Sequence, residues 1–249
     1  MPLPKLTYAE IHERADAKRE RLLRWVRDES FIDATVAAAL LAASPRTASR
    51  TLAALVQADL LRLHLVDGRP IWIMTPRGAL ESWREGDDPT DTGFDGRIAE
   101  STLRHAIACQ RARLRAEAAG WAAWRSDKQI RREAAALLEA KQPTPWLRQP
   151  DALATTPGGL TVAVEVERSP KTSKQYAQIM AGYLQMRRAG TIDEVHYLAE
   201  SQRLADRLAG LCAGIKSLTI RGTAIALRPE HHCVFRFFHL DTWPERTLL

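Results

Sequence analysis

The chain has 249 residues, 45% of them hydrophobic and 27% charged, a balance typical of a soluble globular protein of one large or two ordinary domains. No apolar run is long enough to cross a bilayer and no hydrophobic signal segment follows Met1, so we expect no membrane span and a cytoplasmic location. The cysteines Cys109, Cys212 and Cys233 lie far apart and lack metal-finger or C-x-x-C spacing, as expected in a reducing compartment.

The positive charge is concentrated in one segment. The net charge is +6, and residues 97–148 hold eleven Lys or Arg against five Asp or Glu. A local basic surplus predicts a polyanionic partner, most often nucleic acid. The alternative is the solvated charged face of a helix.

The first third of the chain has the element order of a winged helix-turn-helix. The patterns predict helices over residues 11–27, 33–43 and 45–58, and strands over 61–66 and 70–74. Ser44 as N-cap and Pro45 at the first helical position begin the third helix. Asp67-Gly68-Arg69 supplies the turn between the strands. We therefore predict a winged helix-turn-helix DNA-binding domain over residues 1–84.

The third helix of that domain would enter a DNA major groove. Arg and hydroxyl side chains on its outward face would contact phosphates and bases. The residues expected to contact DNA in this domain are Arg46, Thr47, Ser49 and Arg50 on the helix and Arg69 at the ribbon turn. The alternative is a winged helix that serves dimerisation or packs on its neighbour.

An acidic linker separates this domain from a second one. Residues 85–95 hold five acidic residues with Pro89 and no periodic apolar pattern, so we expect a linker over 85–97 and a second domain over 98–249. The second domain is expected to hold helices at 98–119, 128–141, 172–189 and 201–212, a hairpin at 150–171, and strands at 194–198, 217–220, 223–227 and 233–240. This order predicts an α/β (α+β) domain with a crossover helix packed on a mixed central sheet. Arg104 and Arg111 make its first helix basic, and we expect both to contact DNA.

The hairpin brings two carboxylates together. Pro157-Gly158-Gly159 has turn chemistry, and a turn centred on Gly158 sets Asp151 opposite Glu165. Directly opposed Cβ atoms lie about 5 Å apart, so the two acids would be adjacent at one end of the hairpin. Adjacent carboxylates destabilise the pair unless one is protonated or a cation lies between them.

Asp151 and Glu165 are therefore our candidate ligands for a divalent metal, with Glu167 two residues along the same strand face. Carboxylate oxygens suit Mg²⁺ or Mn²⁺, which neutralise a phosphate and activate an oxygen nucleophile. Lys171 or Lys174 would supply the positive charge that such catalysis uses. Acids on an exposed hairpin face are the alternative reading.

Other residues are ambiguous on sequence alone. Asp127 is a possible additional acid, or a first-turn acid that complements a helix dipole. His105 could touch phosphate or could be a partly buried structural histidine. Tyr176 and Tyr183 lie seven residues apart on one helix face, where they could pack in the core or contact phosphate.

The chain resembles known nucleases at several short motifs. Pro150-Asp151, followed by Glu165-Val166-Glu167 on a valine-rich strand and a helix with Lys and Tyr, resembles the PD-(D/E)xK nuclease superfamily. The whole chain resembles more narrowly the replication-relaxation family, which includes the MobC-type mobilisation relaxases of conjugative plasmids. The segments that carry this likeness are residues 34–78, Leu103-Arg104-His105, Trp124-Arg125-Ser126-Asp127, the hairpin and the helix of Tyr176 and Tyr183.

The resemblance implies a restriction-endonuclease-like domain behind a winged helix. It implies Mg²⁺- or Mn²⁺-dependent hydrolysis that nicks one strand at a plasmid origin of transfer or replication. The implied partners are double-stranded origin DNA, single-stranded DNA at the nick and other mobilisation proteins.

One residue departs from the superfamily pattern. The superfamily places lysine two residues after the strand glutamate, and here Glu167 holds that position. Lys171 and Lys174 are the candidates to replace it. If neither reaches the site, the resemblance implies a DNA-binding accessory protein or regulator with a degenerate nuclease fold.

Overall fold

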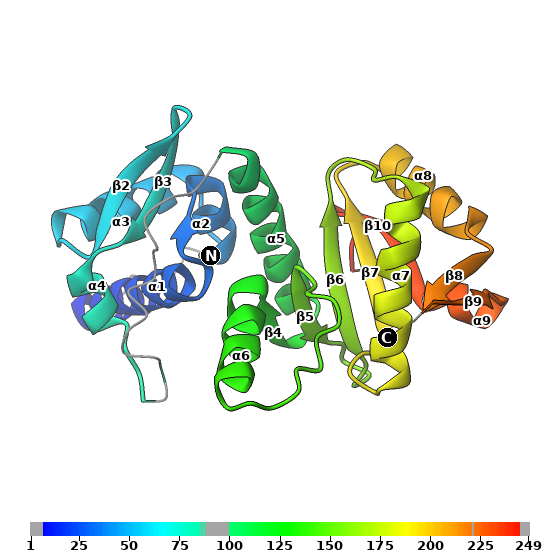
Figure 1. Ribbon diagram of the computed structural model, residues 1–249. Coiled ribbons are helices and arrows are strands. Elements are labelled where there is room, and N and C mark those ends of the chain that lie inside the picture. The colour runs from blue at the N-terminus through cyan, green and yellow to red at the C-terminus, as the bar shows by residue number, and fades with distance from the viewer. Residues whose placement is uncertain (1–6, 86, 88–99, 221, 245–249) are drawn as a thin grey trace. The chain divides into compact units, whose positions relative to one another are not determined.

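The computed structural model describes residues 7–85, 87, 100–220 and 222–244. The chain forms two compact units, Met1–Gln110 and Arg111–Leu249, and the boundary between them falls within helix α5 (Glu100–Ala118) (Figure 1). The predicted acidic linker, 85–97, lies outside the described residues apart from Glu85 and Asp87. None of the described helices combines the length and the apolar character needed to span a membrane.

The first unit is built of short helices and a three-stranded antiparallel sheet. Its elements are α1 (Tyr8–Glu29), β1 (Phe31–Ile32), α2 (Ala34–Leu40), α3 (Pro45–Gln57), β2 (Leu61–Val66), β3 (Arg69–Met74) and α4 (Pro76–Glu81). The strand order is β1-β3-β2. The Ser44 hydroxyl accepts a hydrogen bond from the Thr47 N–H at 3.2 Å, which confirms the predicted start of α3. The predicted ribbon strands are also confirmed, whereas β1 and α4 were not predicted.

The core of the first unit gathers side chains from its sheet and from α5. Phe31, Ile71 and Ile73 pack with Leu103 of α5, and all four are buried. The Gln110 amide donates to the Phe31 carbonyl at 2.9 Å, and its oxygen accepts from the Trp25 indole at 3.3 Å. The first three turns of α5 are thereby fixed to the helices and strands of this unit.

Gly78 in α4 has no room for a side chain. A Cβ there would overlap the carbonyl oxygen of Leu60 and lie 2.8 Å from Met74 Sδ. We expect Gly78→Ala to destabilise the protein by about 3 kcal/mol, because the clash involves backbone that cannot move without disturbing β2. The control is Gly210→Ala in an exposed part of a later helix, where a Cβ meets nothing within 4 Å. Chemical denaturation should show that variant to be more stable by about 0.5 kcal/mol, and equal effects of the two changes would contradict the expectation.

The second unit is a mixed α/β domain. After the last turns of α5 it holds β4 (Ala122–Ser126), α6 (Asp127–Glu139), β5 (Ala152–Thr155), β6 (Thr161–Glu167), α7 (Ser173–Arg188), β7 (Glu194–Ala199), α8 (Gln202–Gly214), β8 (Ser217–Ile220), β9 (Thr223–Ala226), α9 (Pro229–His232) and β10 (Phe235–His239). Five strands form a sheet in the order β10-β7-β6-β5-β4. The strands β10, β7 and β6 are parallel, while β5 and β4 are antiparallel to their neighbours. The predicted mixed sheet is confirmed.

Helices α7 and α8 cover the same face of this sheet. Each connects two parallel strands, β6 to β7 and β7 to β10, and right-handed crossovers that advance in one direction place both helices on one side (Figure 1). The core beneath them includes Tyr176, Tyr183, Val195, Tyr197 and Leu208, all buried. Because side chains alternate along β6, Ala163, Glu165 and Glu167 also point to this helix-covered face.

Candidate functional site

The hairpin has the predicted register. Ala152 lies opposite Val164 and Leu153 opposite Ala163, as a turn centred on Gly158 requires. One residue further along, the same register sets Asp151 opposite Glu165. Asp151 directly precedes β5, and its Oδ2 accepts a hydrogen bond from the Val166 N–H at 2.8 Å. The two carboxylates therefore lie on neighbouring segments at the same end of the hairpin.

Glu165 is a buried acid beside another acid. Only 8% of its surface is exposed, so the reading of an acid on an exposed hairpin face does not apply to it. Burial, and then the charge of Asp151, raises the pKa of Glu165 to about 8. The Tyr183 hydroxyl donates to Glu165 Oε1, and this bond together with Arg148 and Lys171 opposes the rise. The site is therefore short of positive charge, which a cation would supply.

Glu167 forms an ion pair with Lys171, one of the two lysines that the sequence offered as candidates for the site. The Lys171 ammonium is ion-paired with Glu167 Oε2, and the Tyr176 hydroxyl donates to the same oxygen at 3.1 Å. The backbone N–H of Lys171 donates a hydrogen bond to the Tyr176 hydroxyl oxygen at 3.2 Å. Tyr176 is therefore bonded both to the backbone of Lys171 and to the carboxylate that binds the Lys171 ammonium. The Lys171 ammonium therefore lies beside Glu167, two residues along β6 from Glu165. Lys174 is exposed on the first turn of α7 and, among the described residues, forms no ion pair with these acids.

Two tyrosines of α7 match two glutamates of β6. The crossover helix runs back along the strand, so Tyr176 near its start meets Glu167 at the end of β6. Tyr183, two turns later, meets Glu165. Both rings are buried in the core, and both hydroxyls donate hydrogen bonds to carboxylates. Burial, followed by the neighbouring Glu165, raises the pKa of Tyr183 well above its usual value, so this hydroxyl keeps its proton and remains a donor.

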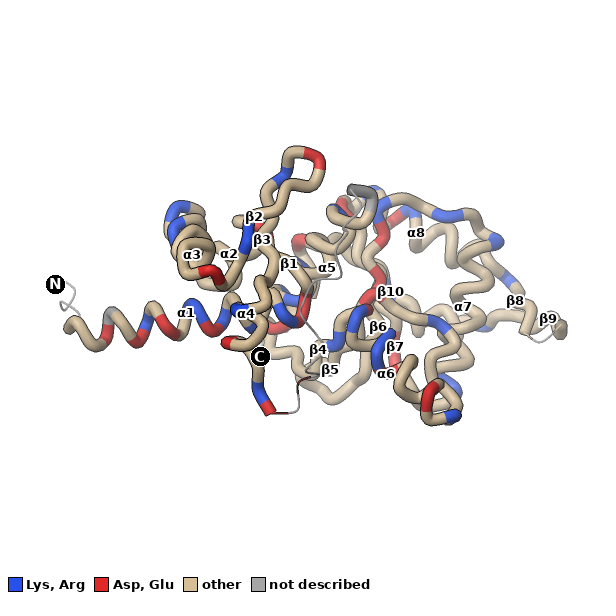
Figure 2. The backbone as a smooth tube through the Cα atoms, turned by 60° about the vertical axis from the view of Figure 1, so that its left-hand side comes forward, with Lys and Arg blue, Asp and Glu red and all other residues tan. Residues whose placement is uncertain are grey.

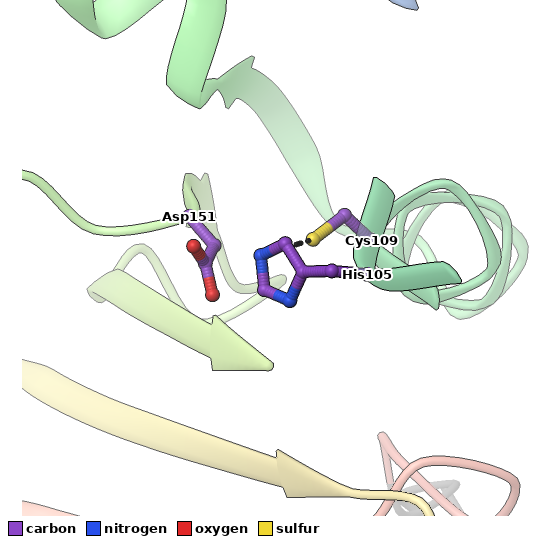
Figure 3. Close-up of side chains that lie close together, drawn as sticks. All are labelled: His105, Cys109 and Asp151. Atoms are coloured by element: carbon purple, nitrogen blue, oxygen red, sulfur yellow. Dashed lines mark hydrogen bonds between the residues drawn. The ribbon is translucent and has the colours of Figure 1, made fainter. Parts of the chain in front are cut away.

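Asp127 and His105 have local partners. Asp127 is the first residue of α6, where its carboxylate accepts from Arg131 Nε at 2.8 Å and its N–H donates to the Asp151 carbonyl at 2.9 Å. His105 lies on α5 one turn before Cys109, and its Nε2 is 3.6 Å from the Cys109 Sγ (Figure 3). These contacts give Asp127 the position of a first-turn acid and leave His105 partly buried.

The residues predicted to contact DNA lie on two elements of the first unit and on α5. Arg46, Ser49 and Arg50 are exposed on α3 and Thr47 is half-buried, while Arg69 is exposed at the turn between β2 and β3. Figure 2 shows the basic positions on α3 and at this turn.

On α5, Arg104 is exposed. Within the second unit the Arg111 guanidinium pairs with Asp241. Arg111 is still 43% exposed on its side chain, so the pair does not shield it from solvent.

Two polar groups near the carboxylates were not predicted from sequence. Tyr197 lies opposite Glu165 in the β6–β7 register, and Arg148 belongs to the segment before β5. The hydroxyl of Tyr197 and the Nε of Arg148 are buried and have no hydrogen-bond partner among the described residues. No motif marks either residue, because their place depends on how separate strands and loops meet.

The arrangement combines acids, an ammonium and buried donors at one end of the sheet. Asp151 and Glu165 offer oxygen ligands to a hard divalent cation, and Lys171 and Arg148 offer positive charge to an anion. No family model, curated protein or solved structure was matched by the chain.

Proposed function

We propose that the protein is a metal-dependent DNA endonuclease that nicks one strand at a site chosen by its first unit, as at a plasmid origin of transfer or replication. The observation that supports this most is the buried Glu165 beside Asp151, with Lys171 held at Glu167. A carboxylate pair that is costly without a cation, next to a fixed ammonium, suits phosphodiester hydrolysis.

The roles of the chain's own groups follow from their contacts. Asp151 and Glu165 would hold Mg²⁺ or Mn²⁺, with Glu167 assisting. The cation would neutralise the phosphate and lower the pKa of a water nucleophile. Tyr183 donates to Glu165 and so orients its carboxylate. Glu167 and Tyr176 position the Lys171 ammonium, which would stabilise negative charge that develops on the phosphate.

The first unit supports DNA as the substrate. Its helix order and three-stranded sheet agree with the predicted winged helix, and α3 presents Arg46 and Arg50 to solvent. The mixed sheet of the second unit agrees with what the nuclease resemblance implies. The alternative function is a DNA-binding accessory protein or regulator, favoured by Glu167 in the place of the usual lysine.

A nicking assay separates the two functions. The protein first selects its preferred sequences from a random duplex library, and supercoiled plasmids that carry them are incubated with Mg²⁺ or Mn²⁺. Open circles that form only with metal are the expected product. Tight binding without open circles in either metal would favour the accessory protein.

The exposed arginines of α3 give a separate prediction for DNA binding. We expect Arg46→Ala combined with Arg50→Ala to weaken binding by roughly 10- to 100-fold and to reduce the slope of log K against log salt by about 1 to 2, since two phosphate contacts are lost. The control, Arg14→Ala with Lys18→Ala, removes the same charge from α1. Fluorescence anisotropy over a salt series measures both, and equal losses in the two double variants would move the DNA interface away from α3.

A further inference from the structure

The segment between α6 and β5 brings an arginine to the carboxylate site from outside the hairpin. A Cβ added at Gly182 would lie 3.5 Å from the Arg148 Cβ and 3.9 Å from the Leu147 carbonyl oxygen. This segment therefore packs directly on α7, one residue before Tyr183. Since Tyr183 donates to Glu165, Arg148 stands next to a residue that contacts the site.

The charge of Arg148 acts on the site. It lowers the pKa of Glu165, and it opposes the rise in the pKa of Tyr183 and of Tyr197. These three groups come from β6, α7 and β7. Arg148 is thus close to the point where the three elements converge.

The half-buried side chain of Arg148 has one polar atom that the described residues leave without a partner. Its Nε is buried and has no hydrogen-bond partner among the described residues, and the same is true of the neighbouring Tyr197 hydroxyl. Buried donors without partners are uncommon in proteins because each one costs free energy. A guanidinium binds a phosphate through two parallel hydrogen bonds, and a half-buried one does so with little competition from water.

We propose that Arg148 binds a non-bridging oxygen of the DNA phosphate that the site attacks. The proposal rests on the proposed function, because it names the group that receives the substrate phosphate at the same site. It assigns the two cations different partners. Lys171 is held by Glu167, whereas the Nε of Arg148 has no hydrogen-bond partner among the described residues and is assigned to the substrate.

Phosphate binding can be measured without cleavage. The probe is thymidine 3′,5′-bisphosphate, titrated by calorimetry into the full chain. We expect Arg148→Gln to weaken its binding by about 10- to 100-fold, the range for loss of a charge-assisted hydrogen-bonded pair. Arg148→Lys keeps the charge but loses the planar guanidinium. Its affinity for the probe should therefore lie between those of the wild type and Arg148→Gln. Arg228→Gln, an exposed arginine of the same unit, is the matched control and should bind as wild type.

Measurement of Mn²⁺ affinity distinguishes two roles for Arg148, which are to bind the substrate phosphate or to neutralise the charge of the carboxylates. Arg148 is not among the proposed metal ligands, and loss of its positive charge does not weaken the attraction of the carboxylates for a cation, so Mn²⁺ affinity in Arg148→Gln should be unchanged or tighter. Nicking should fall by about 10²- to 10³-fold. Wild-type probe binding in Arg148→Gln would overturn the inference, and so would a loss of Mn²⁺ binding that parallels the loss of probe.

The two proposals fail in different ways. If the wild type binds the probe through Arg148 but never nicks DNA, the endonuclease is wrong and the phosphate contact stands. If the wild type nicks DNA and Arg148→Gln nicks equally well, the endonuclease stands and the role of Arg148 is wrong.

Discussion

Asp151→Asn and Glu165→Gln are each expected to lower the rate of DNA nicking by about 10³-fold or more, while DNA affinity stays near that of wild type. Each change replaces a ligand carboxylate by a neutral amide of the same shape, so the divalent cation and its several kcal/mol of transition-state stabilisation are lost. The first unit keeps its exposed α3 arginines in both variants, so binding should persist.

The measurement pairs open-circle formation with Mn²⁺ titration on the same samples. Glu230→Gln, an exposed acid on α9, controls for the loss of one negative charge from the second unit. Both nicking and Mn²⁺ affinity should fall in the two site variants, and neither should change in the control. Site variants that nick at the wild-type rate would exclude this hairpin as the catalytic centre.

The second large effect is on stability as a function of pH. Glu165 has a pKa of about 8 in the folded protein, above the ordinary value of 4.5 that applies when the chain is unfolded. Between these values the folded state binds more protons than the unfolded state. The contribution of Glu165 to stability is therefore complete below about pH 4.5 and is lost as the pH rises toward and through 8. The loss is on the order of 5 kcal/mol for a shift of this size.

Urea denaturation at pH 5.5, 7 and 8.5 tests this expectation. Other groups titrate too, so the quantity that matters is the wild-type free energy of unfolding minus that of Glu165→Gln at each pH. Without metal, this difference should fall steadily as the pH rises. With Mn²⁺ the wild-type loss should shrink, because a bound cation favours the carboxylate. A difference that does not change with pH would mean that Glu165 is not held protonated by its surroundings.

Local signals were sufficient for much of the fold. Ser44 and Pro45 fixed the start of α3, and the turn glycines fixed the register that sets Asp151 opposite Glu165. Strand β4 was not found, because Ala122–Ser126 has no alternating apolar pattern and pairs with β5 through an irregular register. The edge strand exists because β5 offers it a partner, and that is a property of the folded sheet.

Only part of the candidate site could be predicted from the sequence. The acids and Lys171 lie within one hairpin and the turn after it, where period and turn chemistry are informative. The hydroxyl partners required knowledge of how α7 crosses β6, and Arg148 required knowledge of which loop packs at Gly182. Such contacts depend on the docking of elements, which no local pattern reports.

Because α7 directly follows β6 in the chain and runs antiparallel to it, the residues assigned to the site lie close together in the sequence. This has an evolutionary consequence. Every acid, cation and hydroxyl assigned to the chemistry, apart from Tyr197, belongs to residues 148–183, one uninterrupted stretch of coding sequence. Their spacing is set by a hairpin, a loop and a single crossover. If the proposed function is correct, recombination could exchange the first unit without breaking this stretch, and a lineage could acquire a new target site while it keeps the same chemistry.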